Sequence, residues 1–163
     1  MTQDRPSRIT TTLWFDGRVE EAAELYTSLL PGSRVVRLTH YPEGAPGPAG
    51  GVLTAELVVA GMPLVLLNGG PGFPQTEAVS LSVACADQEE VDRLWSGLLA
   101  GGGEESQCGW LKDRFGVSWQ VVPDALPELL SDPDPERARR ATQAMLGMRK
   151  LDVAALRRAA DGA

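Results

Sequence analysis

The chain has 163 residues, of which 43% are hydrophobic and 23% charged, and its net charge is −7 at pH 7. This size and composition are typical of one globular domain and exclude a disordered or fibrous chain, so we expect a single domain over residues 1–163. A net negative chain without a concentrated basic block repels phosphate, which excludes nucleic acid as a partner.

The apolar runs and the scarce residue types limit the cellular compartment and the mechanisms that are compatible with the chain. The apolar runs, such as residues 64–67, fall far short of the roughly 20 residues that cross a bilayer, and the N-terminus MTQDRPSRIT lacks a signal-peptide stretch. We therefore expect a cytoplasmic protein with no membrane partner and with Cys85 and Cys108 as free thiols. The single histidine, His40, excludes a mechanism that needs two imidazoles in one chain.

Hydrophobic periodicity predicts the elements of the first half of the chain. A strand at 8–15 is followed by a helix at 19–30 with apolar residues at helical spacing. Further strands follow at 33–41 and within 51–68, where the chain turns at Ala60-Gly61. These elements form a βαβββ module over residues 8–70.

The second half repeats this order. A strand at 78–85 precedes a helix at 91–99, which Asp87 and Glu90 begin with a capping pattern. A loop or strand near 104–110 and a strand at 117–123 complete a module over residues 78–123. The helix ends are alike in sequence, ELYTSLLPG against RLWSGLLAG, so the chain is a duplicated βαβββ unit and its fold class is α+β.

Two segments lie outside this repeat. The run PEGAPGPAGG at 42–51 predicts either a solvated connection or a mobile lid. Residues 124–163 form a C-terminal helical extension, in which Asp134 and Pro135 begin a helix. The stripe of Ala138, Ala141, Met145 and Met148 is expected to pack on the domain or on a partner chain.

The paired modules resemble a known family in several motifs. LWFDG at 13–17, LNGGP at 67–71, CGWLKDRFGVSWQVVP at 108–123 and MRKLDVAAL at 148–156 are similar to the PhnB-like, demethylubiquinone methyltransferase-labelled branch of the vicinal oxygen chelate superfamily. That superfamily also contains glyoxalase I, bleomycin-resistance proteins and extradiol dioxygenases. The resemblance implies that each module forms a U-shaped sheet, that two modules enclose a cleft, and that the protein is a homodimer.

The resemblance also implies where a metal would be bound. Metal-dependent relatives place ligands on the first and last strands of each module, and strand alternation assigns these places to Thr10, Glu56, Ala78 and Gln120. In this assignment the strand around 53–59 counts as the fourth, with Leu53, Leu57 and Val59 toward the helix and Val52, Thr54 and Glu56 toward the cleft. On the first strands of the two modules, Ile9, Leu13, Phe15, Val79, Leu81 and Val83 are expected to face the helices.

Those four positions are a poor metal site. A divalent transition metal needs three or four imidazole, carboxylate or thiolate ligands, and here only Glu56 is a strong one. We therefore expect no metal and no resident cofactor, with a weak displaced site at His40 and Glu56 as the alternative.

Glu56 remains the most informative charge. In a cleft walled by Trp14 and Trp110 it would be desolvated, which would make it a general base. Alternatively, it is a carboxylate tied to Gln120 or a threonine. The expected ligand-binding residues are polar or aromatic side chains of the cleft: Thr10, Thr12, Trp14, Asn68, Ser80, Trp110 and Gln120.

The run at 108–123 is expected to be mainly a hairpin. Cys108 lacks a nearby base in the sequence, which favours a packed residue over a nucleophile. Asp113 is expected to accept backbone N–H groups of the turn. The glycine run at 67–73 leads into a strand and not a helix, so it does not predict an S-adenosylmethionine site, and methyl transfer is the least favoured activity.

The sequence therefore favours a metal-free protein that binds a small organic molecule. Two alternatives stay open. One is a lyase or isomerase of the glyoxalase type that uses Glu56 as base; the other is a sequestering resistance protein, which needs only affinity.

Overall fold

The computed structural model describes residues 9–163, which divide into two compact units, one ending at Gln75 and one running from Thr76 to Ala163. We call them the first and second units. The first contains β1 (Thr11–Phe15), α1 (Val19–Leu29), β2 (Arg34–His40), β3 (Val52–Val59) and β4 (Met62–Asn68). The second contains β5 (Ser80–Cys85), α2 (Gln88–Leu99), β6 (Glu104–Glu105), β7 (Trp110–Lys112), β8 (Ser118–Pro123), α3 (Ala125–Leu130), α4 (Pro135–Leu146) and α5 (Val153–Asp161).

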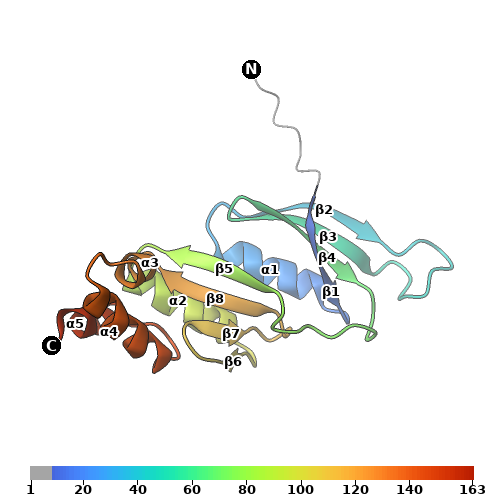
Figure 1. The fold of residues 1–163 in the computed structure, drawn as a ribbon. Helices are drawn as coiled ribbons and strands as arrows, with labels where there is room; N and C mark the ends of the chain where they lie inside the picture. Colours follow the sequence, from blue (N-terminus) through green and yellow to red (C-terminus); the bar gives the residue numbers. More distant parts are fainter. Residues whose placement is uncertain (1–8) are drawn as a thin grey trace, which may run out of the picture. The chain divides into compact units, whose positions relative to one another are not determined.

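Both units have the same mixed four-stranded sheet (Figure 1). The strand order is β1-β4-β3-β2 in the first and β5-β8-β7-β6 in the second. In each, the first and last strands of the unit are parallel neighbours, and the other pairs are antiparallel. The predicted α+β duplication is confirmed.

The register fixes which residues of the two units are equivalent. Thr12 lies opposite Val65 in the first parallel pair, and Ser82 lies opposite Gln120 in the second. Val65 and Gln120 hold the same place after the glycines that open their strands, Gly61 and Gly116. Thr12 and Ser82 are therefore equivalent, and the other residues of the two parallel strand pairs correspond one by one in the same register.

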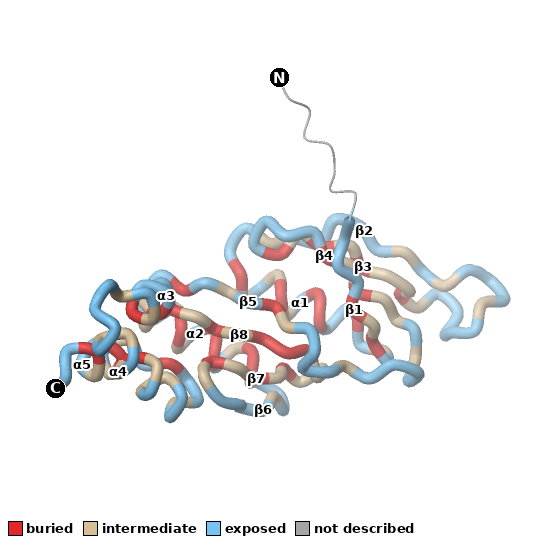
Figure 2. The backbone as a smooth tube through the Cα atoms, viewed as in Figure 1, coloured by how far each residue is buried: buried red, intermediate tan, exposed pale blue. Residues whose placement is uncertain are grey.

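One face of each sheet is buried against its helix. In the first unit Leu13, Phe15 and Leu57 are buried together with Ala22 and Tyr26 of α1, and Figure 2 shows this burial alternating along the strands. Alternation along a strand puts every second side chain on the helix side, which is why these positions are apolar. The opposite faces carry the polar residues considered below.

Four of the expected orientations are wrong. Ile9 and Val79 were expected to face the helices but are 85% and 61% exposed. Both precede the first paired residue of their strands, Thr11 and Ser80, so no neighbouring strand covers them.

Val52 and Leu53 are the other two. A register shift between Thr39 and His40 interrupts the alternation at this end of β3, so Val52 is buried and Leu53 turns to the other face.

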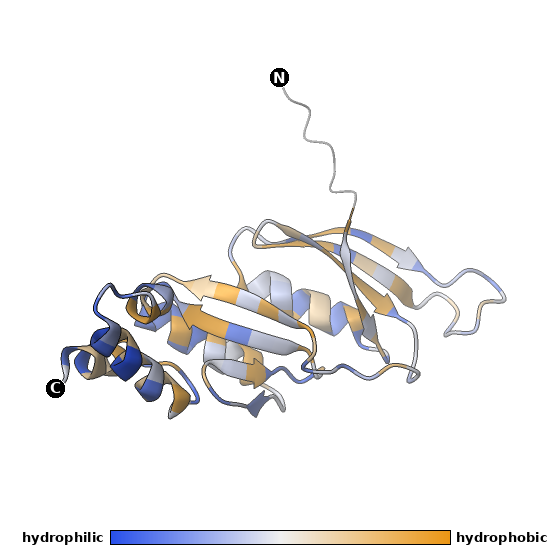
Figure 3. Cartoon of the chain, viewed as in Figure 1, coloured by the Kyte–Doolittle hydropathy of each residue, from blue (hydrophilic) through white to orange (hydrophobic). Residues whose placement is uncertain are grey.

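The C-terminal helices belong to the second unit and bring their own core. Buried residues of this core are Leu126, Leu129, Ala141, Leu151, Leu156 and Ala160, with Met145 and Met148 packed beside them. Helices α4 and α5 also carry several hydrophilic residues (Figure 3). Most of the predicted stripe therefore packs within the unit. No helix among residues 9–163 is both long and apolar enough to cross a membrane.

A turn at Cys108-Gly109 attaches this extension to the sheet. The Cys108 and Gly109 N–H groups donate to the carbonyl oxygens of Met148 and Arg149 at 2.8 and 2.7 Å. A Cβ at Gly109 would lie 2.9 Å from Leu151 Cδ1, and its φ is +84°. Only glycine fits here without strain, because the position combines left-handed backbone with close packing.

Asp113 organises the hairpin that follows. Its Oδ1 accepts from Phe115 N at 2.9 Å and from Val117 N at 3.1 Å, as the sequence predicted. Its Oδ2 accepts from Trp119 Nε1 at 2.9 Å, and both side chains are buried. The buried carboxylate is thus satisfied by three donors, and it fixes the indole of β8 to the turn.

Candidate functional site

The open face of the first sheet carries one row of residues across all four strands. Thr12 of β1, Val65 of β4, Glu56 of β3 and Arg37 of β2 are successive partners in the register. Thr12 is exposed and the Glu56 side chain keeps 33% of its surface exposed. A polar edge therefore flanks an apolar centre at Val65.

Glu56 is held by Arg37, a residue that was not predicted for the site. Arg37 Nε donates to Glu56 Oε1 at 3.0 Å, and a second guanidinium nitrogen donates to the same oxygen. The bond to Glu56 and its negative charge raise the pKa of Arg37. In the structure the Glu56 carboxylate is therefore tied to Arg37, where the sequence had suggested Gln120 or a threonine.

The strand order corrects the assignment of Glu56 to a last strand. Glu56 lies on β3, and the last strand of the first unit is β4, where the same row is occupied by Val65. The equivalent of Gln120 is therefore Val65, and the equivalent of Glu56 is Trp110. A valine cannot ligate a metal ion, so the ligand pattern is even poorer than the sequence indicated.

Beside this row the same face ends in a hollow of about 580 Å³, which we call the aromatic hollow. It lies where β1 and β4 end and where the loop between β2 and β3 passes over the sheet. The residues that line it are Trp14, Asp16, Gly17, Tyr41, Pro42, Ala45, Pro46, Gly47, Pro48, Leu53, Leu67, Asn68, Gly69 and Gly70. Its size is within the range of small-molecule sites.

Trp14 is fixed from several sides. Its Nε1 donates to Gly70 O at 2.7 Å, and its ring meets the edge of Phe73 with centroids 5.0 Å apart. A Cβ at Gly69 would lie only 2.2 Å from Trp14 Cζ2, so the glycine lets the backbone lie flat against the indole. The predicted glycine run thus has a packing role.

Tyr41 and Asn68 close the other side of the aromatic hollow. The Tyr41 hydroxyl donates to Asn68 O, and a Cβ at Gly47 would meet the Tyr41 ring. Asn68 Oδ1 accepts from Gly17 N at 2.8 Å. The Asn68 side chain therefore holds the turn after β1.

Some of the site residues predicted in the second unit lie close to one another. Gln120 Nε2 donates to Ser80 Oγ at 2.9 Å, and Trp110 is the partner of Gln120 on the next strand. Thr10 and Ala78 precede β1 and β5, and both are exposed. Gln120, Ser80 and Trp110 thus form a local group, and Thr10 and Ala78 belong to no strand.

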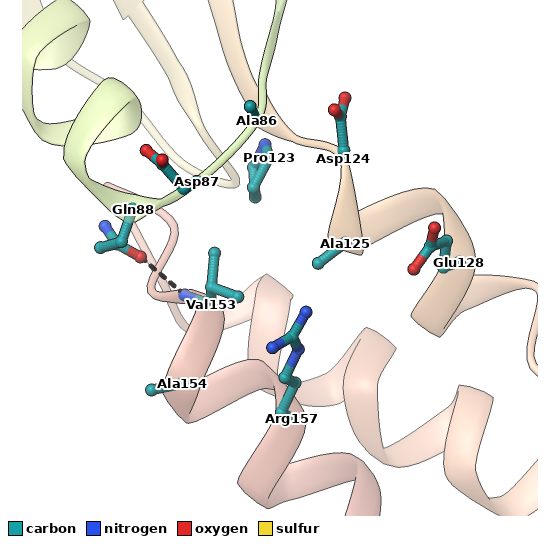
Figure 4. Close-up of a pocket in the computed structure, with 10 residues that line it drawn as sticks. All are labelled: Ala86, Asp87, Gln88, Pro123, Asp124, Ala125, Glu128, Val153, Ala154 and Arg157. Atoms are coloured by element: carbon teal, nitrogen blue, oxygen red, sulfur yellow. Dashed lines mark hydrogen bonds between the residues drawn. The ribbon is translucent and has the colours of Figure 1, made fainter.

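The second unit has a hollow in the place equivalent to the aromatic hollow (Figure 4). Its volume is about 540 Å³, and its wall includes Ala86 and Pro123, the equivalents of Asp16 and Asn68. We call it the second hollow. Here the wall is completed by α3 and α5, and Figure 4 shows the Arg157 guanidinium pointing into it.

The available His, Cys, Asp and Glu side chains show whether a metal ion could be bound. Among residues 9–163, no group of three or more His, Cys, Asp or Glu side chains is arranged to hold an ion. His40 pairs with Val52, four residues along β3 from Glu56, which is about 13 Å at the usual rise per residue. One ion could not join His40 and Glu56.

S-adenosylmethionine does not fit the described residues either. Its usual site requires a strand and a glycine turn that open directly into a helix. Here the chain after Asn68 continues through a loop into β5, and the glycine next to Asn68 is needed by Trp14.

Sequence reasoning missed Arg37, Asp16, Tyr41 and Arg157. Arg37 could have been found by pairing the second strand with the third, because it is the cross-strand neighbour of Glu56. Tyr41 and Asp16 were detectable only as residues that follow strands. Arg157 lies on a helix far along the chain from the residues beside it, so no local pattern indicates its place.

Comparison with known proteins now decides the family. The family profile described as 3-demethylubiquinone-9 3-methyltransferase matches residues 7–122. The chain belongs to this PhnB-like family. The family lies within the vicinal oxygen chelate superfamily, as the sequence motifs predicted. A comparison with curated proteins gives no match.

Solved structures agree with the PhnB-like assignment. A PhnB protein of Bacillus cereus that carries the 3-demethylubiquinone-9 3-methyltransferase name is 35% identical, with 72% of this chain and 99% of that chain covered and a TM-score of 0.66. A Pseudomonas aeruginosa protein is 27% identical over 72% of this chain and 98% of that chain, with a TM-score of 0.59.

A more distant structure shares the fold. FosX, a fosfomycin resistance protein of Listeria monocytogenes, is 15% identical over 77% of this chain and 97% of that chain, with a TM-score of 0.55.

Proposed function

We propose that this PhnB-like protein binds a small organic molecule on the open face of its first sheet, without a resident metal ion. The observation that carries the proposal is the row Thr12–Val65–Glu56, which offers one carboxylate already paired with Arg37. Such a row gives a ligand hydrogen-bonding groups around an apolar centre but lacks the ligand set of a transition metal.

The adjacent aromatic hollow supports the same proposal. It continues the open face past Trp14 and Leu67, and its wall is mostly apolar with few polar groups, as in most small-molecule sites. Ser80, Trp110 and Gln120 are proposed as ligand-binding residues within the second unit itself. The protein acts as a homodimer in this proposal, which would cover the exposed edge strand β2 of the first sheet.

The experiment combines metal analysis with ligand screening on the untagged full chain. After dialysis against a chelator, we expect less than stoichiometric zinc, nickel or iron and unchanged binding of fragment hits that shift the amide signals of residues 12–14 and 53–56. Retained stoichiometric metal, or the absence of any hit on this face, would contradict the proposal.

Catalysis by Glu56 is the second candidate function. One observation favours it, because the Glu56 carboxylate lies on the open face with 33% of its side chain exposed, where a bound ligand can reach it. An isomerase or lyase would lose turnover in Glu56→Gln, and Arg37→Gln would change the pH profile of the rate. If bound ligand is recovered chemically unchanged, the protein sequesters it, as a resistance protein would.

A further inference from the structure

We propose that the aromatic hollow binds an organic cation, with a planar apolar body and a positively charged nitrogen. This inference rests on the proposed small-molecule function and names the class of ligand for the same face. It depends on the composition of the wall, on the hydrogen bonds already made there, and on how the equivalent second hollow is filled.

The wall selects an apolar, flat body. Trp14 and Tyr41 contribute rings, Leu53 and Leu67 contribute aliphatic surface, and prolines of the loop between β2 and β3 cover the top. Tyr41 N donates to Gly51 O at 3.0 Å, which closes this loop at its base and keeps the prolines in place. A rigid ring system would displace water from both kinds of surface.

The charge of the wall selects a cation. Among the described residues that line the aromatic hollow, Asp16 is the one charged side chain, and it is exposed. The faces of Trp14 and Tyr41 are electron-rich and attract a positive nitrogen within about 6 Å. The Asp16 carboxylate and the two aromatic rings therefore both favour a positively charged ligand.

The hydrogen bonds within the wall disfavour an anion. The indole N–H of Trp14 and the hydroxyl of Tyr41 both donate to backbone carbonyl oxygens, of Gly70 and Asn68. An anion would have to break these bonds to obtain a donor, and it would face Asp16 besides. A cation needs no such rearrangement.

The second hollow provides an internal precedent. It is equivalent by register, and acidic residues of its wall are Asp87, Asp124 and Glu128. Into it points a planar cation of the chain itself, the guanidinium of Arg157 from α5 (Figure 4). In the first unit no basic side chain lines the equivalent space among the described residues, so the cation has to come from outside.

The test uses three probes of one two-ring shape: N-methylquinolinium as the cation, methylnaphthalene as the neutral match and naphthoate as the anion. Binding to the full chain is followed by calorimetry and by shifts of the Trp14 indole signal. We expect N-methylquinolinium to bind about five-fold more tightly than methylnaphthalene, and naphthoate to bind most weakly.

Variants assign this preference to the hollow. Asp16→Asn should weaken N-methylquinolinium about three-fold and leave methylnaphthalene within two-fold. Glu43→Gln is the matched control, because Glu43 lies exposed on the covering loop outside the wall, and it should change neither. Tyr41→Leu should reduce the cation preference further, whereas Tyr41→Phe, which keeps the ring, should retain it.

The outcomes separate this inference from the proposed function. Equal affinity for N-methylquinolinium and methylnaphthalene, or a preference that Asp16→Asn leaves undiminished, would overturn the cation inference and leave small-molecule binding intact. Failure of all three probes to shift Trp14 would also overturn the inference. Fragment hits on residues 53–56 would still support the proposed function in that case.

Discussion

The two hollows occupy equivalent places in the two units, at the ends of β1 and β4 in one and of β5 and β8 in the other. In the first, Trp14 and a proline-rich loop form the wall and the space is open to a ligand. In the second unit Ala84 is the register equivalent of Trp14 and does not line the hollow, and helices α3 and α5 supply the wall together with Arg157. One βαβββ plan thus gives a candidate binding surface in one copy and an attachment surface for the extension in the other.

The hairpins differ in the same sense. β2 and β3 have 7 and 8 residues, whereas β6 and β7 have 2 and 3. The short edge strand β6 consists of Glu104 and Glu105, and such charged edges resist pairing with other chains. The long β2 exposes Val35, Val36 and Leu38 and supports the loop over the aromatic hollow. The longer hairpin therefore belongs to the unit that carries the candidate site.

The largest effect is expected where the second unit attaches its extension. Gly109→Ala would place a Cβ 2.9 Å from both Leu151 Cδ1 and Val121 O, at a φ of +84°. Strain and overpacking together should lower the free energy of unfolding by about 4 kcal/mol, measured by urea denaturation. Hydrogen exchange should increase at Cys108 and Gly109, because their bonds to the extension would be lost.

Gly147→Ala is the control for this change. Its nearest contact is 3.5 Å and its φ is −86°, so the added methyl group is tolerated in place. Equal destabilisation by both variants would show that the turn at residues 108–109 is not the attachment point, and the contrast between the two hollows would lose its physical basis.

A second large effect is expected at the hairpin of the second unit. Asp113→Asn keeps the size of the side chain but puts an N–H₂ group opposite Trp119 Nε1, or opposite the two backbone donors if the amide turns over. Two facing donors in a buried site should lower the free energy of unfolding by about 2 kcal/mol.

A double-mutant cycle with Trp119→Phe isolates the bond between the two side chains. The phenylalanine removes the indole donor, so Asp113→Asn should cost less in that background. Additive effects in denaturation experiments would argue that Asp113 acts only through the backbone of the turn. The first unit offers a contrast, since its equivalent turn at Ala60 is held by Ser33 Oγ, which accepts from Ala60 N at 2.9 Å.

The fold was largely predictable because its signals are local. Helical spacing, the Asp87 cap, the turn at Ala60-Gly61 and the hairpin within 108–123 each depend on neighbouring residues, and the duplication repeats the pattern. Ile9 and Val79 were placed wrongly because alternation says nothing about where strand pairing begins. Val52 and Leu53 were placed wrongly because a bulge is set by the partner strand.

The candidate site was less predictable because it depends on contacts between strands. Glu56 was predicted to lie on the cleft-facing side of its strand. Its partner Arg37 and its place on β3 follow from the strand register, which cannot be determined from the sequence alone. Trp14 was predicted as a cleft wall, yet the aromatic hollow also needs Tyr41 and the course of a loop. Arg157 requires the packing of a helix about 70 residues from Asp87.

A smaller effect is expected from the wall of the aromatic hollow. In Gly69→Ala the Cβ would overlap the Trp14 indole, so the ring must move, and the free energy of unfolding should fall by about 1.5 kcal/mol. Tryptophan fluorescence should shift and N-methylquinolinium binding should weaken. Gly72→Ala, with no atom within 4 Å of the added Cβ, should change neither.

The smallest effect separates the two cysteines of the second unit. Burial, then the charges of Glu90 and Asp124, raise the pKa of the Cys85 thiol from 9.0 to about 12, and its residue is fully buried. In native protein iodoacetamide should therefore modify the half-buried Cys108 and spare Cys85 until the chain unfolds. Equal rates of modification, followed by mass spectrometry, would contradict the burial of Cys85.

The raised pKa of Cys85 also gives a stability change with a definite sign. Above pH 9 the unfolded chain releases the Cys85 proton while the folded chain retains it, so unfolding becomes more favourable as the pH rises toward 12. Between pH 8 and pH 10 the free energy of unfolding should fall by about 1 kcal/mol from this group. In Cys85→Ala that part of the loss should vanish, and an unchanged pH dependence of urea denaturation would assign it to other groups.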